Sequence, residues 1–171
     1  MLTGGRSMFK GYLLISITLQ GVNPPSQRAR STMRHFYTIL DHTADMRIRV
    51  SGTDQADLFK KAGLALFDLI TKPERLKPRE IIEVAVTGDD PADLMVNYLR
   101  ELLYLWTGNE KLVKRIEIVH ISNTAVCARV STDRYQPDRH EILHEIKAVT
   151  YHQIDVSHTT DDWEATVLFD V

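Results

Sequence analysis

The chain has 171 residues, of which 43% are hydrophobic and 26% charged, as in an ordinary globular domain with one hydrophobic core. Its 21 Lys and Arg residues against 23 Asp and Glu residues give a net charge of -2, which excludes nucleic-acid binding through a bulk basic field. The single cysteine, Cys127, excludes an internal disulfide and favours a reducing compartment, so we expect a cytoplasmic protein.

Residues 1–33 differ in character from the rest of the chain. An apolar run at 12–19 follows Arg6 and Lys10 and resembles a short signal-peptide core, but residues 20–25 offer no convincing small-residue cleavage site. The run is also too short to cross a bilayer, so no membrane association is expected. Met33 stands just before the first strand pattern. We therefore predict an N-terminal extension at 1–33, either disordered or the product of a misassigned start site, and a single domain at 34–171.

The first half of this domain predicts two strands, a helix and a third strand. Residues 36–40 are strand-like, and residues 46–50 alternate apolar side chains with arginines, as in a half-buried strand. Asp54 can cap a helix that continues to Ile70, with apolar residues recurring at helical spacing. Residues 80–87 alternate again and predict the third strand.

The second half predicts a helix followed by four strands. Asp90 as N-cap and Pro91 in the first turn start a helix that Gly108 ends. Strand patterns follow at 113–122, 124–131, 145–156 and 163–171, with a hairpin between the first two and a polar loop at 133–139. This order predicts an α+β fold, in which two helices pack on a mostly antiparallel or mixed β-sheet sandwich.

One short motif, His140-Glu141-Ile142-Leu143-His144, matches the zinc-protease signature H-E-x-x-H. That chemistry needs both histidines on one helical face and a glutamate that polarises a zinc-bound water. Pro137 precedes the motif closely and a strand pattern follows it, so no suitable helix is predicted. We favour a loop-to-strand segment with solvated histidines. A stand-alone zinc-dependent hydrolase using His140, Glu141 and His144 is the alternative function.

Candidate ligands of another kind lie near the two ends of the domain. Asp45 shares the polar face of its strand with the arginines that follow it, and Asp170 lies on the more polar face of the last strand. If the fold joins these strands, the two carboxylates and an oxygen of Val171 offer hard ligands that suit Ca²⁺, Mg²⁺ or Mn²⁺. The residue types alone favour a plainer interpretation, in which Asp45 and His42 are turn residues and Asp170 is a frayed terminal residue.

Five ordered segments resemble one family, the archeases. Residues 37–45 (Y-T-I-L-D-H-T-A-D) resemble the family's opening signature, and residues 62–69 resemble its A-x-x-A-L-F helix. Residues 97–105 resemble its second helix, residues 147–152 (K-A-V-T-Y-H) a later strand, and residues 168–171 its terminal strand. One departure stands at 46–49, where M-R-I-R replaces the small, often glycine-containing segment that usually follows H-T-A-D.

The resemblance implies an accessory protein and not an enzyme in its own right. Archeases assist the GTP-dependent RNA ligase that joins 3′-phosphate or 2′,3′-cyclic-phosphate ends to 5′-hydroxyl ends in tRNA splicing, promoting guanylylation of the ligase and its repeated turnover. The expected partner is therefore that ligase, with tRNA reached through it, and the oligomeric state is not predicted. A chaperone-like module that modulates several partners is a further alternative.

The resemblance also implies a set of site residues. It assigns a divalent metal ion, with Ca²⁺ favoured and Mg²⁺ or Mn²⁺ as alternatives, to three ligands: Asp45, Asp170 and Val171. It names three functional neighbours of that ion: Asp41, His42 and Lys147.

Overall fold

A computed structural model describes residues 7–9, 12–17, 36–41, 45–160 and 162–171. Its described strands form two antiparallel sheets. The five-stranded sheet has the order β1 (Ser7–Phe9), β2 (Tyr12–Ile17), β5 (Glu80–Thr87), β7 (Ala125–Arg134), β6 (Lys111–Ile121). The four-stranded sheet has the order β3 (Tyr37–Asp41), β4 (Asp45–Gly52), β9 (Trp163–Asp170), β8 (Ala148–His158).

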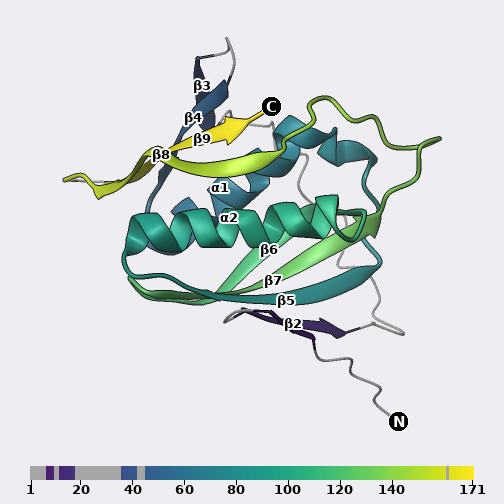
Figure 1. The fold of residues 1–171 in the computed structure, drawn as a ribbon, viewed down its shortest axis with the longest axis horizontal. Coiled ribbons are helices and arrows are strands. Elements are labelled where there is room, and N and C mark those ends of the chain that lie inside the picture. Colours follow the sequence, from purple (N-terminus) through teal and green to yellow (C-terminus); the bar gives the residue numbers. More distant parts are fainter. Residues whose placement is uncertain (1–6, 10–11, 18–35, 42–44, 161) are drawn as a thin grey trace.

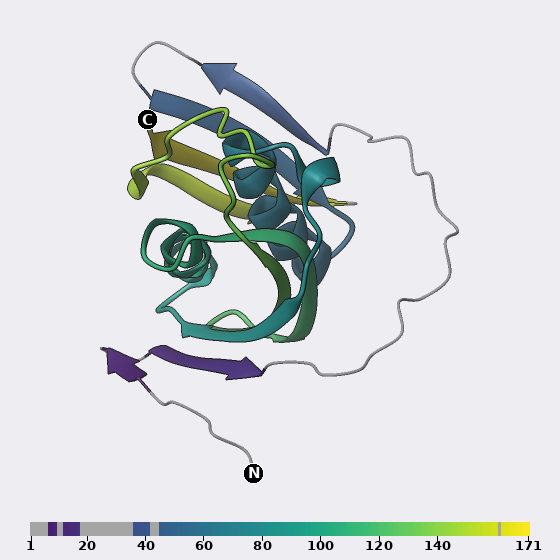
Figure 2. The same ribbon diagram turned by 90° about the vertical axis from the view of Figure 1, so that its right-hand side faces the viewer.

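The two long helices, α1 (Gln55–Ile70) and α2 (Pro91–Thr107), lie between the two sheets (Figures 1 and 2). Helix α1 contacts β4 on one side and β6 on the other, and α2 contacts β8 on one side and β5 on the other. This placement explains why both helices bury residues around most of their circumference, since a helix covered on two sides must be apolar on both. The predicted α+β architecture is confirmed.

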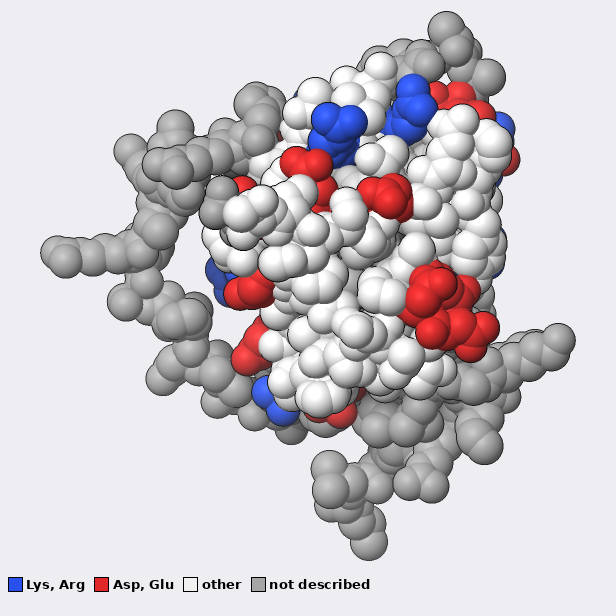
Figure 3. All heavy atoms as spheres, turned by 90° about the vertical axis from the view of Figure 1, so that its left-hand side faces the viewer, with Lys and Arg blue, Asp and Glu red and all other residues white. Residues whose placement is uncertain are grey.

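Each helix begins at an aspartate that follows a tightly packed glycine. Asp54 accepts the N–H of Asp57 at 2.7 Å, and Asp90 accepts the N–H groups of Ala92 and Asp93 at 2.8 Å. A Cβ atom at Gly88 would collide with the backbone of the following first turn of α2. Both predicted helix starts are thus confirmed. Figure 3 views the end of the molecule where the helices begin, and acidic side chains gather there, as the helix dipole favours.

Some boundaries differ from those predicted. Strand β7 continues to Arg134, through the start of the predicted loop, because Lys111 at the start of β6 pairs with it. Strand β8 begins at Ala148, the first residue that is paired in register with a residue of β9. A short 3-10 helix, Pro73–Arg75, lies in the connection after α1.

Within the predicted extension, the structure places β1 and β2 at the edge of the larger sheet, where β2 pairs with β5. The division of the chain at residue 33 stays a prediction. Among the described residues, no helix combines the length and the apolar character needed to span a membrane.

Candidate metal centre

Three strands bring the predicted ligands to one end of the four-stranded sheet. Asp45 at the start of β4 lies directly opposite Asp170 at the end of β9. On the other side of β9, Ala148 at the start of β8 lies opposite the same residue. Val171 follows Asp170 and is marked C in Figure 1. Register therefore joins two carboxylates that the sequence separates by most of the domain.

Strand alternation turns both carboxylates away from the helices. Met46 and Ile48 of β4 are buried on the side that packs on α1, whereas Asp45 is exposed. In β9, Phe169 is fully buried and Asp170 is half-buried. The predicted parity of both strands is confirmed, and the two carboxylates are cross-strand neighbours on the outer face of the sheet.

The two aspartates place like charges opposite each other. Directly opposed residues of an antiparallel pair have Cβ atoms about 5 Å apart, and like charges there destabilise the pair. Within the described part of the chain, neither Asp45 nor Asp170 forms an ion pair. The small side chain of Ala148 on the far side of Asp170 supplies no charge either. A bound cation would remove this repulsion.

Lys147 ties the last residues of the chain to this corner. Its main-chain N–H donates to the carbonyl of Asp170 at 2.8 Å, and its ammonium group donates to the main-chain oxygen of Val171 at 2.9 Å. The predicted neighbour Lys147 thus lies beside two of the predicted ligands. We call the four residues Asp45, Lys147, Asp170 and Val171 the carboxylate corner.

The other two predicted neighbours are less fully defined. Asp41 ends β3, where its backbone pairs with that of Arg47, and His42 lies outside the described residues.

Arg47 donates to the side-chain oxygen of Gln153 at 2.8 Å and so bridges β4 to β8 across β9. Gln153 has φ of 55° in a stretch of β8 that leaves the regular ladder. Sequence reasoning missed Gln153, because no pattern marks a non-glycine residue in the left-handed region.

Comparison with known proteins identifies the family. Residues 37–171 match the model of the Archease protein family (MTH1598/TM1083). The chain belongs to the archease family. The protein archease of Methanosarcina mazei is 33% identical over 139 residues, which cover 79% of this chain and 95% of the relative. The protein archease of Pyrococcus abyssi is 34% identical over 136 residues, which cover 77% of this chain and 95% of the relative.

The similarity extends to an animal archease and to a solved structure. The protein archease-like of Drosophila melanogaster is 28% identical over 140 residues, covering 79% of this chain and 90% of the relative. The solution structure of Methanobacterium thermoautotrophicum protein 1598 superposes with a TM-score of 0.68 at 23% identity, covering 81% of this chain and 100% of the other. That structural match supports the archease fold of this chain.

The donor atoms of the carboxylate corner fit a hard cation. The described residues hold no group of three or more His, Cys, Asp or Glu side chains that could bind a metal ion. Beside the two aspartates, Val171 offers a main-chain oxygen within the described part of the chain. Such an open set of oxygen donors suits Ca²⁺, Mg²⁺ or Mn²⁺ and does not suit a structural zinc ion. The assignment of an ion to Asp45, Asp170 and Val171 stays a prediction.

The H-E-x-x-H motif of this archease is not on a helix. Residues 140–147 are extended or irregular, and Ile142 forms an isolated bridge with Thr71 just after α1. His140 and His144 therefore do not share a helical face, as the zinc-protease chemistry requires. The expectation of solvated histidines holds for the exposed His144 but is wrong for His140, which is only 3% exposed.

His140 is buried within a set of compensated charges. Its Nδ1 accepts the N–H of Gln136 at 3.1 Å, and its Nε2 lies 3.3 Å from the Asp133 carboxylate. The same carboxylate accepts from the guanidinium of Arg139 at 2.6 Å and from the N–H of Lys77 at 2.7 Å. Burial, and then the positive charge of Arg139, lower the pKa of His140 and favour a neutral ring. We call Asp133, Arg139 and His140 the His140 cluster, and its contacts indicate a structural role.

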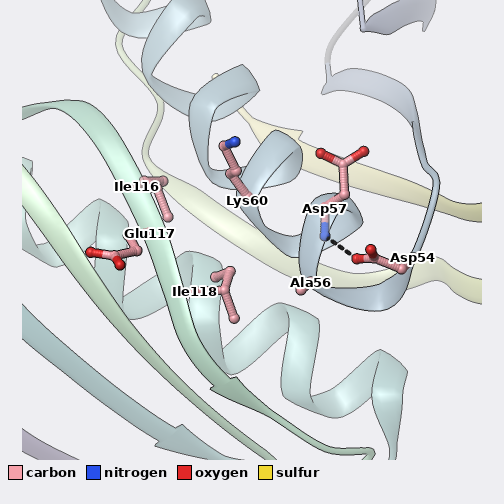
Figure 4. Close-up of a pocket in the computed structure, with 7 residues that line it drawn as sticks. All are labelled: Asp54, Ala56, Asp57, Lys60, Ile116, Glu117 and Ile118. Carbon is pink, nitrogen blue, oxygen red and sulfur yellow. Dashed lines mark hydrogen bonds between the residues drawn. The ribbon is translucent and has the colours of Figure 1, made fainter.

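A groove of about 480 Å³ lies between the first turn of α1 and strand β6 (Figure 4). Asp54, Asp57 and Lys60 line one side of it, and Ile116 and Ile118 line the other. Its acidic groups already have partners, because Asp54 caps the helix, Asp57 forms an ion pair with Lys61 at 2.6 Å, and Glu117 lies 3.9 Å from Arg129. It also lies at the end of β4 opposite to Asp45, so it is separate from the carboxylate corner.

Proposed function

We propose that this protein is a metal-binding accessory protein that activates a GTP-dependent RNA ligase in tRNA splicing. Family membership supports an accessory role for the chain. The observation that carries the metal site is the register of β4 and β9, which places Asp45 directly opposite Asp170. Neither carboxylate forms an ion pair with a basic side chain among the described residues. This role would place the protein in the cytoplasm.

The residues of the carboxylate corner have separate tasks in this proposal. Asp45 and Asp170 would hold the ion from adjacent strands, and Val171 would add its main-chain oxygen. Lys147 keeps Val171 in place through its ammonium group. A divalent ion held here would supply positive charge that can orient phosphate oxygens. The ligase or its nucleotide could supply further oxygen ligands to an ion held by these residues.

The proposed effect on the ligase is a shift in its population of states. An accessory protein that binds the guanylylation-competent form of the ligase more tightly raises the fraction of that form. The ligase would then accept GMP repeatedly, which is what multiple turnover requires. RNA is bound by the ligase in this scheme, which agrees with the lack of a bulk basic field on the chain.

The test is RNA ligation under multiple-turnover conditions, with the guanylylated fraction of the ligase measured from labelled GTP. Asp45→Asn and Asp170→Asn are expected to lose stimulation, because each removes one of the opposed carboxylates. Glu164→Gln is the matched control, since Glu164 lies on β9 with the same parity as Asp170, at the far end of the ladder. Full stimulation by folded Asp45→Asn and Asp170→Asn, or none by the unmodified protein, would overturn the proposal.

A further inference from the structure

Helix α2 runs beside β8 (Figure 1). Side chains on one face of the helix contact the first part of this strand. The Nε–H of Arg100 donates to the carbonyl of Val149 at 3.0 Å. The guanidinium of Arg100 also lies 4.5 Å from the ring centre of Tyr151, which is within the range of a cation–π contact. We call Asp93, Asn97, Arg100 and Tyr151 the α2–β8 clamp.

The hydroxyl of Tyr151 completes the clamp at the helix side. It donates to the Asp93 carboxylate at 2.7 Å and shares the same proton with the side-chain oxygen of Asn97 at 3.0 Å. Asp93, Asn97 and Arg100 follow one another at i, i+4 and i+7, so they share one face of α2. The hydrogen bond from Tyr151 lowers the pKa of Asp93 most strongly, followed by the N–H of Asp89. Asp93 therefore stays ionised and remains a strong acceptor for the clamp.

The position of β8 in the sheet explains what the clamp adds. β8 is the edge strand of its sheet, so only β9 pairs with its backbone among the described strands. The regular register covers Ala148 to Thr150 and then shifts before Asp155. The beginning of β8 is thus held to β9 by a ladder only three residues long. Arg100 takes a carbonyl of this same short segment and fixes it from the helix side.

We propose that the α2–β8 clamp is a positioning device for the carboxylate corner. Lys147 immediately precedes the clamped segment, and it bonds to the main-chain oxygens of both Asp170 and Val171. A displacement of β8 moves Lys147 and so moves these two ligands relative to Asp45. Among the described contacts, no clamp residue forms a hydrogen bond with Asp45, Asp170 or Val171. This inference rests on the proposed metal site and adds a set of residues that determine its geometry.

The inference is tested by calorimetric titration of the full chain with Ca²⁺, together with amide hydrogen exchange. Arg100→Ala is expected to weaken Ca²⁺ binding by about tenfold, the lower range for residues that support metal ligands. Tyr151→Phe keeps the ring on Arg100 and loses the hydroxyl, so a smaller loss is expected. In both variants the amide of Lys147 should exchange faster, while that of Ile48 in the middle of β4 should be unchanged.

Tyr104→Phe is the matched control, because Tyr104 is an exposed tyrosine of the same helix whose ring lies beside Gly108 at the other end. It should keep the original Ca²⁺ affinity and the original exchange rate at Lys147. Unmodified protein that binds neither Ca²⁺ nor, in parallel titrations, Mg²⁺ or Mn²⁺ would overturn the metal site itself. Unmodified protein that binds Ca²⁺, with folded Tyr151→Phe and Arg100→Ala binding it equally well, would overturn the role of the clamp alone.

Discussion

The His140 cluster and the carboxylate corner contain similar chemical groups in opposite electrostatic conditions. In the His140 cluster, the Asp133 carboxylate is only 2% exposed and accepts from Arg139 and from the N–H of Lys77. In the carboxylate corner, two carboxylates lie opposite each other on adjacent strands. No basic side chain of the described residues forms an ion pair with either of them. The first arrangement satisfies its own charges. The second would gain stability from a bound cation, and it is therefore the better candidate for function, although the H-E-x-x-H motif is the more conspicuous sequence.

The largest effect is expected from removing the centre of the compensated cluster. Asp133→Ala would remove the acceptor of two donors, the Nη2 group of Arg139 and the main-chain N–H of Lys77. We expect a loss of about 3 kcal/mol in the free energy of unfolding, as for other broken buried pairs. Urea denaturation measures this, with Asp138→Ala in the same loop as an exposed control. A loss no larger than that of the control would show that the cluster is not structural.

Removing a carboxylate from the carboxylate corner should stabilise the metal-free protein, whereas removing Asp133 from the His140 cluster should destabilise it. Asp170→Asn is expected to reduce Ca²⁺ affinity by at least tenfold, since it removes a predicted ligand. Without metal, the same substitution should raise the free energy of unfolding by about 0.5 kcal/mol, because it removes one of two opposed like charges. Titration calorimetry and urea denaturation in a chelator give the two values. Destabilisation in the chelator would mean that the Asp170 carboxylate has a structural partner.

The pH dependence of stability should trace to the His140 cluster. The unfolded chain protonates His140 near its ordinary pKa of 6.5, whereas the folded chain does so only at lower pH. Below about pH 6.5 the unfolded state therefore binds more protons, and the free energy of unfolding should fall until the folded pKa is passed. Urea denaturation at about pH 7.5 and about pH 5.5 should show this fall.

Two variants assign that pH effect to one histidine. His140→Asn keeps an acceptor near the position of Nδ1 and should reduce the fall in stability between the two pH values. His144→Asn changes an exposed histidine of the same segment and should leave the fall intact. An unchanged fall in His140→Asn would assign the pH effect to another group.

The smallest effect on stability is expected from a substitution at Glu141, an exposed residue of the H-E-x-x-H segment. Glu141 forms a solvent-exposed ion pair with Lys72 at 2.6 Å, and such pairs contribute little to stability. Glu141→Gln should leave the unfolding curve and the stimulation of the ligase unchanged. A zinc hydrolase built on the motif would instead lose its activity in this variant, so a peptidase assay of both proteins separates the two functions.

The features that sequence predicted best are those decided by local chemistry. Asp54 and Asp90 marked both helix starts, because capping depends on a few neighbouring residues. Alternation along 46–50 and 163–171 predicted which side of each strand Asp45 and Asp170 occupy. The family resemblance, carried by five separate segments, is confirmed.

The features that sequence missed depend on partners distant in the chain. The burial of His140 follows from its contacts with Gln136 and Asp133 around a turn, which no periodicity reveals. The segments of α2 and β8 that resemble the family were visible separately, but the contact of Arg100 with Val149 and Tyr151 was not. The pairing of Asp45 with Asp170 could be suggested but not established, because parity sets the face of a strand and leaves its register open.

The central position of β9 in its sheet has a consequence for biosynthesis. β9 is the last strand in chain order, yet it lies between β4 and β8 and is the described strand that joins them. While the chain is being made from its N-terminus, β4 has no β9 on which to pair, and the outer face of the sheet cannot form. The carboxylate corner therefore comes into existence only after synthesis has passed residue 170 and added Val171. A shortened chain would retain the larger sheet's strands but would lack the proposed metal site altogether.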